Sequence, residues 1–227
     1  MNARPRRPGV LLAGATGLVG RELLRQLLAQ QPPLALHALV RRVPADADTR
    51  VHWLQVDFAR LPALPAADEA WCCLGTTLRQ AGSHQAFRAV DFDAVLGFAR
   101  AAQAAGATRL GVVSALGASP RALGFYSSVK GQMEAAVAAL GFAHLVVARP
   151  SLLLGDRDAL GQPQRLAEGL ALRLGAPLAP LLPARVRPIA ARTVARGMIA
   201  ALREQRPGVR IVESGELQRL GGDGAWS

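Results

Sequence analysis

Short apolar runs alternate along the chain with longer segments in which apolar residues recur at helical spacing. Val10–Ala13 is an apolar run that ends at a glycine, which is typical of a buried strand. In Leu18–Gln30 the leucines fall on one helix face, and Pro32 stops the pattern. The chain therefore begins with a strand followed by an amphipathic helix.

The same alternation continues as far as Pro150. We expect further strands at Leu36–Val40, Val51–Val56, Ala70–Leu74, Leu110–Val113 and Leu145–Ala148, and helices at Phe87–Ala105 and Tyr126–Leu140. Beyond Pro150 we expect helices at Arg165–Leu174 and Thr193–Arg203 and a short strand at Arg210–Val212. This order predicts an α/β fold, a doubly wound parallel sheet (Rossmann fold) with right-handed crossovers and a small C-terminal substrate-side extension.

The turn between the first strand and the first helix is rich in glycine. It reads AGATGLVG, so that the residues Gly14, Ala15, Thr16, Gly17, Leu18, Val19 and Gly20 carry three glycines at a G-x-x-G-x-x-G spacing. Glycines here allow a tight turn, a close approach of backbone to a pyrophosphate, and close packing of helix on strand. The helix N-terminus adds free N–H groups and partial positive charge. We predict that this turn binds a dinucleotide.

The end of the second expected strand indicates which dinucleotide binds. NAD sites usually place an acid there to hold the ribose 2′-hydroxyl, whereas this chain has Arg41 and Arg42. Guanidinium groups suit a 2′-phosphate, so we predict NADP(H) as the cofactor. The alternative is that both arginines are solvated surface residues of an arginine-rich chain.

Two further loops follow expected strands on the cofactor side. Asp57 and Phe58 come after the third strand, where an acid can accept a hydrogen bond from the adenine amino group. Leu74, Gly75, Thr76 and Thr77 come after the fourth strand, where a small loop can pass beneath the cofactor ribose. We predict that both loops contact the cofactor.

The chain has one tyrosine, Tyr126, and one lysine, Lys130, four positions apart on an expected helix. They share a helix face. A nearby ammonium stabilises a phenolate and makes a tyrosine useful for acid–base chemistry at neutral pH. Ser114 follows the fifth strand, at the sheet edge where such folds bind ligands, and its hydroxyl can polarise a carbonyl group. Each residue alone is unremarkable, but together they predict a catalytic set.

The composition of the chain argues against several classes of binding partner. The net charge of +11 comes from arginines spread along the chain, so we expect no specific nucleic-acid partner. No apolar run is long enough to span a bilayer, and no membrane partner is expected. The adjacent Cys72 and Cys73 form neither a disulfide framework nor a zinc motif, so we expect no metal site and a cytoplasmic location.

These motifs resemble those of the short-chain dehydrogenase/reductase superfamily. GATGLVG, VRR, CCLGTT, YSSVKGQMEA and ARPSLLLGDR resemble its atypical subgroup related to the Tat-interacting-protein oxidoreductase, over about residues 9–157. The resemblance implies an NADP-binding Rossmann fold with Ser114, Tyr126 and Lys130 as the catalytic triad, and a cofactor contact from Lys130 and from Arg149 and Pro150. The chain departs from the superfamily where many members use a helix asparagine, since Asp91 falls in that region.

The 227 residues are interpreted as one NAD(P)-binding domain, because a chain of this length and hydrophobic content can bury a single core. It has a basic flexible tail (1–8), a cofactor-binding core (9–157) and the extension (158–227). The leading hypothesis is an NADPH-dependent oxidoreductase acting on a small-molecule carbonyl substrate. The alternatives are an NADPH-responsive binding protein with little turnover, or a sugar-nucleotide epimerase or dehydratase. A homodimer is expected by analogy with relatives.

Overall fold

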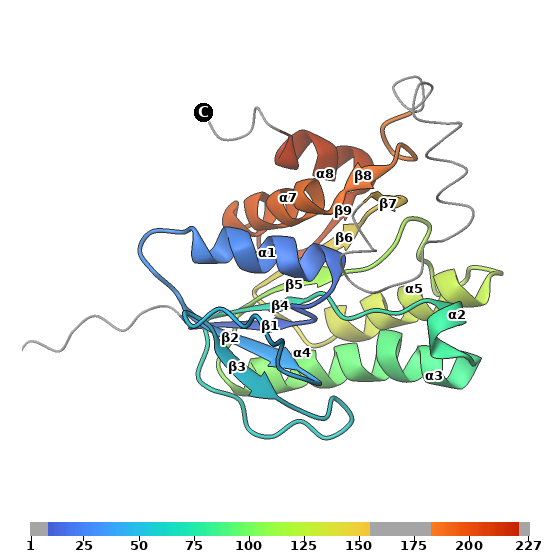
Figure 1. Ribbon diagram of the computed structural model, residues 1–227. Helices are drawn as coiled ribbons and strands as arrows, with labels where there is room; N and C mark the ends of the chain where they lie inside the picture. Colours follow the sequence, from blue (N-terminus) through green and yellow to red (C-terminus); the bar gives the residue numbers. More distant parts are fainter. Residues whose placement is uncertain (1–8, 155–182, 223–227) are drawn as a thin grey trace, which may run out of the picture.

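The computed structural model describes residues 9–154 and 183–222, which form a seven-stranded sheet with helices on both faces (Figure 1). The strands of this sheet are β1 (Gly9–Ala13), β2 (Ala35–Val40), β3 (His52–Gln55), β4 (Glu69–Cys72), β5 (Arg109–Val113), β6 (His144–Arg149) and β9 (Gly208–Glu213). The helical segments are α1 (Leu18–Leu28), α2 (Leu78–Ala81), α3 (His84–Arg88), η1 (Ala89–Ala94), α4 (Val95–Ala104), α5 (Phe125–Ala138), α7 (Ala191–Arg203) and α8 (Ser214–Gly221). The short strands β7 (Leu153–Leu154) and β8 (Ile189–Ala190) pair separately.

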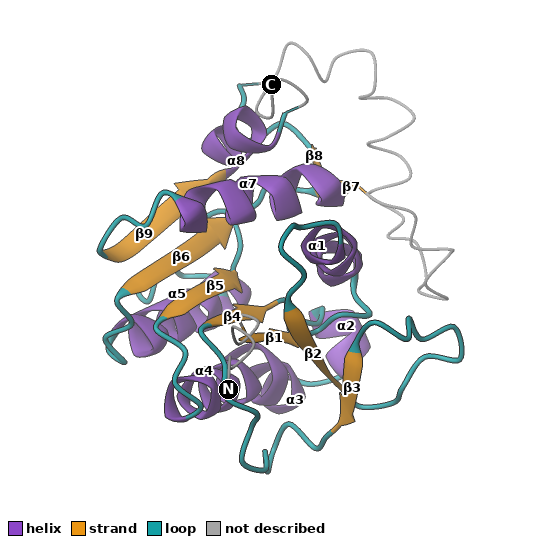
Figure 2. Cartoon of the chain, turned by 90° about the vertical axis from the view of Figure 1, so that its left-hand side faces the viewer, coloured by secondary structure: helices purple, strands orange, loops and turns teal. Residues whose placement is uncertain are grey.

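The strand order confirms the predicted Rossmann fold. The sheet runs β3-β2-β1-β4-β5-β6-β9, and every neighbouring pair is parallel (Figure 2). Because β1 lies between β2 and β4, the chain winds outward from β1 in both directions. The carboxyl end of β1 is therefore the point at which open α/β sheets bind ligands.

Side chains of alternate strand residues point to opposite faces of the sheet and pack in two separate hydrophobic cores. Val10 and Leu12 of β1 face a core shared with α1 and α7, while Leu11 and Ala13 face a core shared with α4 and α5. Figure 1 shows the same division, with α1, α7 and α8 on one side of the sheet and α3, α4 and α5 on the other. Both faces are covered, which explains why the strands read as continuous apolar runs.

The single long helix expected at Phe87–Ala105 is divided into three segments. Its first part is the short helix α3, its middle is the π-helical segment η1, and only its second half is the α-helix α4. A π-helix carries more residues per turn than an α-helix and often marks a functional position. The fully buried Asp91 lies within η1.

The C-terminal residues of the described chain join the main sheet. The expected strand Arg210–Val212 lies within β9 at the sheet edge, and the expected helix Thr193–Arg203 lies within α7. Val194 and Met198 of α7 are fully buried in the core formed with α1. The helix expected at Arg165–Leu174 lies outside the described residues.

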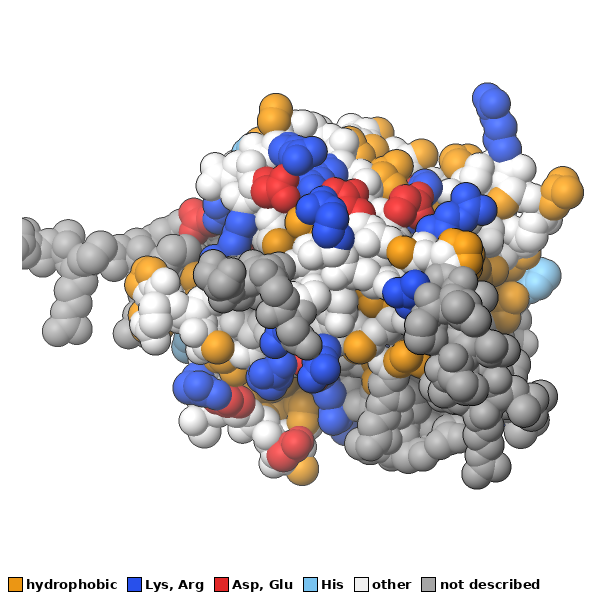
Figure 3. All heavy atoms as spheres, turned by 90° about the horizontal axis from the view of Figure 1, so that it is seen from above, with side chains coloured by type: hydrophobic (Ala, Val, Ile, Leu, Met, Phe, Trp, Pro, Cys, Tyr) orange, Lys and Arg blue, Asp and Glu red, His pale blue; other side chains and the backbone are white. Residues whose placement is uncertain are grey.

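The surface over α1, α7 and α8 mixes charges of both signs with apolar groups (Figure 3). Arg210 of β9, for example, pairs with Glu204 at 3.0 Å and with Glu216 at 2.7 Å. Much of the positive charge here is thus interleaved with acids. No described helix has the length and apolar character to cross a membrane.

The first prediction concerns the outer strands of the sheet, where the rings of His37 and His52 stack with centroids 4.9 Å apart. Partial burial and the neighbouring His52 lower the pKa of His37 from its ordinary value of 6.5. The imidazole of His37 therefore binds a proton more readily in the unfolded chain than in the folded chain. The contribution of His37 to the free energy of unfolding is present above pH 6.5 and is lost as the pH falls below that value. We expect His37→Gln to lose less stability on acidification than the natural protein, measured by urea unfolding at about pH 7.5 and about pH 5.5. His84→Gln, at an exposed position outside the sheet, is the control, and an equal acid response in all three proteins would contradict the assignment.

Candidate dinucleotide and catalytic site

The glycine turn packs directly against the loop after β4. Gly14 has a φ of +81°, and a Cβ there would lie 2.6 Å from the carbonyl carbon of Cys73 and 2.9 Å from the amide nitrogen of Leu74. A Cβ on Gly20 would collide with the carbonyl oxygen of Gly14. The fold requires glycine at Gly14 and Gly20, because another segment of backbone lies where a Cβ would be.

Gly17 differs, because it faces open space. A Cβ there would meet only the carbonyl oxygen of Gly14, at 3.5 Å, and its backbone is extended. Gly17 is also the N-cap of α1, where no side chain caps the helix and no acid occupies the first turn. The free N–H groups and positive end of α1 thus border an open position, which fits a pyrophosphate.

A cleft of about 520 Å³ begins at this turn and follows the carboxyl edge of the sheet. It lies among the glycine turn, the ends of β2 and β4, the loop after β3 and the segments α2, α3 and η1. Its lining residues are Gly14, Thr16, Gly17, Leu39, Val40, Arg41, Phe58, Cys73, Leu74, Gly75, Thr76, Gln80, Ala81, Ala86, Val90 and Ala94. The size and position of the cleft suit an extended dinucleotide.

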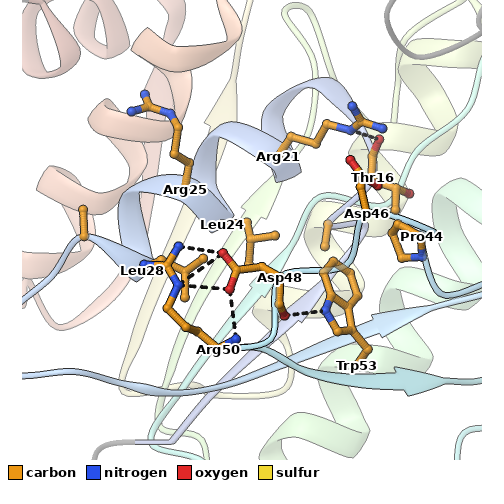
Figure 4. Close-up of a pocket in the computed structure, with 12 residues that line it drawn as sticks. Thr16, Arg21, Leu24, Arg25, Leu28, Pro44, Asp46, Asp48, Arg50 and Trp53 are labelled. Carbon is orange, nitrogen blue, oxygen red and sulfur yellow. Dashed lines mark hydrogen bonds and ion pairs between the residues drawn. The ribbon is translucent and has the colours of Figure 1, made fainter.

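A second hollow, of about 440 Å³, lies on the other side of Thr16, between α1 and the loop from β2 to β3 (Figure 4). Arg21 points toward the turn there and donates an Nε–H bond to the carbonyl oxygen of Thr16 at 3.2 Å. Arg50 is held by Asp48 at 2.6 Å, and Trp53 donates to the carbonyl oxygen of Asp48 at 3.1 Å. The polar groups of this wall are engaged with one another, while the Arg21 guanidinium lies beside Thr16 of the cofactor cleft.

The predicted cofactor residues divide into two groups. Eight of them line the cleft: Gly14, Thr16, Gly17, Arg41, Phe58, Leu74, Gly75 and Thr76. Arg41 and Arg42 are exposed at the end of β2, and neither forms an ion pair with another described residue. The turn residues Ala15 and Val19 are buried instead, and Leu18 packs against the same core.

Four other predicted cofactor residues make contacts within the protein. Asp57 accepts the backbone N–H of Ala59 at 2.9 Å, and Thr77 caps α2 by accepting the N–H of Gln80 at 3.1 Å. The carbonyl oxygen of Pro150 accepts the N–H of Leu116. None of these three, nor Arg149, lines the cleft.

Arg149 ties β6 to α5 and β9. Its guanidinium binds both carboxylate oxygens of Glu134, at 3.0 and 2.6 Å, and Glu213 at 3.1 Å. The hydrogen bond to Glu134, against the partial burial, raises the pKa of Arg149 above its ordinary value, with Glu213 adding to the effect. Arg149 therefore holds the helix that carries Tyr126 and Lys130 against the sheet.

Lys130 lies next to Gly75 of the cleft, does not itself line the cleft, and is almost fully buried. Its ammonium nitrogen is 2.7 Å from Oδ1 of Asp91, whose side chain is 0% exposed. A Cβ on Gly75, which lines the cleft, would lie 3.7 Å from this nitrogen. Burial lowers the pKa of Lys130, but the Asp91 carboxylate outweighs it, with Tyr126 adding to the effect, and the net shift is upward. Lys130 is therefore an ammonium group beside the cleft and in electrostatic contact with Tyr126.

Tyr126 is half-buried near the start of α5. Its ring packs on the fully buried Phe87 of α3, with centroids 5.4 Å apart, which limits how the ring can turn. Phe125 packs on the same Phe87 and stacks on His84 at 3.9 Å. The aromatic contacts thus position the phenol from the side of α3.

Ser114 follows β5 directly and is 4% exposed. Its backbone N–H donates to Ala148 of β6 at 2.7 Å, which fixes the residue at the sheet edge. Its buried hydroxyl has no hydrogen-bond partner among the described residues. Such a hydroxyl retains capacity for a ligand oxygen.

Some residues of the site were missed from the sequence. Gln80, Ala81 and Ala86 line the cleft from short helices that the periodicity did not indicate, and Val90 lines it from η1, within the helix that was expected. The capping residues Thr77 and Ser83 were a usable signal, since each accepts an N–H three residues later. The pairing of Asp91 with Lys130 had no signal in the spacing.

Comparison with known proteins gives one family match and several similar proteins. The chain matches the family described as NAD(P)H-binding over residues 14–169. Protein HTATIP2 of Rattus norvegicus is 38% identical over 156 residues, which are 66% of this chain and 64% of the rat protein. Protein FMP52-1, mitochondrial, of Scheffersomyces stipitis is 31% identical over 220 residues, 91% of this chain and 96% of that protein.

A solved structure, MoeE5 in complex with UDP-glucose and NAD, has a similar fold. Its TM-score is 0.69 at 15% identity, covering 95% of this chain and 81% of that chain. This likeness supports the fold alone.

The expectation of a plain cytoplasmic location is wrong. Fungal relatives, among them the Scheffersomyces stipitis protein, are named mitochondrial. Two unpaired cysteines indicate only a reducing compartment, and this does not separate the cytoplasm from other reducing compartments.

The second prediction uses the difference between the two glycines of the turn. Gly17→Val places methyl groups in the open position, so we expect dinucleotide affinity to fall by about tenfold or more as hydrogen bonds of about 1.5–3 kcal/mol are lost. The unfolding temperature changes much less than in Gly14→Val, because a Cβ at this position meets no atom closer than 3.5 Å. Fluorescence titration with NADPH and NADH measures the affinity. Gly14→Val is the contrasting variant and is expected to unfold, and unimpaired binding in Gly17→Val would rule out this cradle.

Proposed function

This chain belongs to the NAD(P)H-binding family, and from that premise we propose that it is an NADPH-dependent oxidoreductase that reduces a carbonyl group. The observation that carries the proposal is the position of Lys130. Its buried ammonium lies beside Gly75 of the dinucleotide cleft and acts on Tyr126, the one tyrosine of the chain. A buried ammonium beside the cleft, with an electrostatic effect from Tyr126, supports an acid–base role for the two residues.

The reaction is a two-electron reduction of a carbonyl to an alcohol. NADPH, when bound, supplies the hydride that adds to the carbonyl carbon. Tyr126 donates its phenolic proton to the carbonyl oxygen, and the Lys130 ammonium stabilises the phenolate that remains. Ser114 donates its unpartnered hydroxyl to the same oxygen and orients it. A proton from solvent then restores Tyr126.

The preference for NADPH rests on the charge at the end of β2. Arg41 lines the cleft, Arg42 follows it, and Arg21 lies beside Thr16 at the junction with the second hollow (Figure 4). No described acid pairs with Arg41 or Arg42. A 2′-phosphate at this point gains charge-assisted hydrogen bonds, whereas a 2′-hydroxyl gains little.

The third prediction tests this preference. Arg41→Ala is expected to weaken NADPH binding by about tenfold, the loss of one charge-assisted hydrogen bond, and to leave NADH binding nearly unchanged. Fluorescence titration with each cofactor gives the ratio. Arg100→Ala, which removes an exposed arginine from α4, controls for the change in net charge. An unchanged NADPH-to-NADH ratio would exclude Arg41 from the 2′-phosphate site.

The fourth prediction tests the chemistry. Tyr126→Phe is expected to lower NADPH-dependent turnover of a carbonyl substrate by about 100-fold or more while NADPH affinity is retained. A panel of aldehydes and ketones, followed by loss of NADPH absorbance, identifies the substrate class first. Ser127→Ala, on the next residue of α5, is the control. Full activity in Tyr126→Phe would refute the mechanism.

The second candidate function is that of a sugar-nucleotide epimerase. It is supported by the similarity of the fold to that of MoeE5, which was solved with UDP-glucose and NAD. A sugar-nucleotide epimerase retains its oxidised cofactor through the reaction cycle. Purified protein that carries tightly bound oxidised dinucleotide and reduces no carbonyl would favour that function over the one proposed.

A further inference from the structure

The carboxylate of Asp91 joins three elements in the interior of the protein. Oδ1 pairs with the Lys130 ammonium of α5 at 2.7 Å, and Oδ2 accepts the backbone N–H of Thr76 at 2.8 Å. Thr76 and its neighbour Gly75 line the cofactor cleft. Asp91 itself lies in the π-helical segment η1. One side chain thus connects the lysine to the loop that borders the cleft.

A buried ammonium needs a partner. Its removal from water is costly, and a lysine without a counter-charge responds by losing its proton. The groups that act on Lys130 are Asp91 from η1, Tyr126 from its own helix and the Cys72 thiol from β4. Burial raises the pKa of Cys72 to about 12, so this group is a neutral thiol near pH 7. Asp91 is the carboxylate that pairs with Lys130 among the described residues.

We propose that Asp91 is a positioning residue that keeps Lys130 charged and holds its ammonium between Tyr126 and the cleft loop. An asparagine at this position would supply hydrogen bonds but no charge. A carboxylate both holds the ammonium by a hydrogen bond and balances its positive charge. The buried pair as a whole therefore carries no net charge. The inference rests on the proposed function for what Lys130 does to Tyr126, but its test observes Lys130 itself.

The chain offers an unusual test, because Lys130 is its only lysine. Protein prepared with ¹⁵N- and ¹³C-labelled lysine, and with no lysine added by a tag, gives one side-chain NMR signal. The pH titration of that signal reports the charge of Lys130 directly. In the natural protein we expect the midpoint above the ordinary lysine value of 10.5. In Asp91→Asn we expect it below 10.5, since burial then acts without the counter-charge.

Asp93→Asn is the matched control. Asp93 lies in the same segment and undergoes the same chemical change, but its side chain is exposed. Its lysine signal should titrate as in the natural protein. A midpoint for Asp91→Asn that equals that of Asp93→Asn would overturn the proposal, as would a natural protein whose lysine titrates below 10.5.

A double variant keeps the test decisive if Asp91→Asn does not fold. Removal of one member of a buried pair is strongly destabilising, while removal of both is often tolerated. We expect Asp91→Asn with Lys130→Met to be more stable than Asp91→Asn alone, measured by urea unfolding. A double variant that is no more stable would overturn the proposal.

The outcome is separable from that of the proposed function. The lysine titration and the unfolding measurements need neither cofactor nor substrate, so they stand even if Tyr126→Phe retains full turnover. Where a carbonyl substrate is found, Asp91→Asn should lose activity at a lower pH than Asp93→Asn as Lys130 becomes neutral. Identical pH–rate profiles would show that the charge of Lys130 does not act in catalysis.

Discussion

The close approach of the turn after β1 to the loop after β4 is the constraint on which the rest of the structure depends. The backbone N–H of Cys73 donates to Ala13 at 2.8 Å, and the next residue, Gly14, leaves no room for a side chain against that loop. The contact fixes β4 beside β1 while β2 continues on the other side. The connections that follow β1 and β4 leave the sheet on opposite sides at the carboxyl end of β1, and the cleft lies between them. A phosphate placed there would meet the N-terminus of α1, because the turn contributes backbone and almost no side chains.

Two ion pairs, each with one member on α5, contrast the places of arginine and lysine in this chain. Glu134 faces Arg149, whose planar guanidinium engages both carboxylate oxygens and still reaches Glu213. Lys130 occupies a tighter place, with Asp91 on one side and Gly75 on the other. A compact ammonium needs less room than a planar guanidinium and presents its charge at one point. Shape thus decides which basic residue each position accepts.

The sequence was informative wherever structure follows from local pattern. The strands around Val10 and Leu110 and the helix at Tyr126 are set by apolar runs and helical spacing, and the structure confirms them. The π-helical turn at Asp91 was missed, because it arises from contacts between residues distant in the chain. The Tyr126–Lys130 spacing predicted a shared face, but the counter-charge of Lys130 comes from another element. Local sequence patterns therefore predicted the strands, the helices and the candidate catalytic residues. The counter-charge of Lys130 depends on tertiary packing and could not be predicted in this way.

The distribution of buried polar groups separates the part of the fold that provides stability from the part suited to chemistry. Of the five buried polar or charged residues among those described, four lie on α5, on η1 or directly after β5: Asp91, Ser114, Lys130 and Glu134. The two core clusters, one on each face of the sheet, are apolar. Burial of charge gives little net stability even when it is paired, so a scaffold selected for stability alone would fill these positions with apolar side chains. Asp91, Lys130 and Ser114 are therefore positions that stability alone does not explain, and buried polar groups of this kind are candidates for a role in ligand binding.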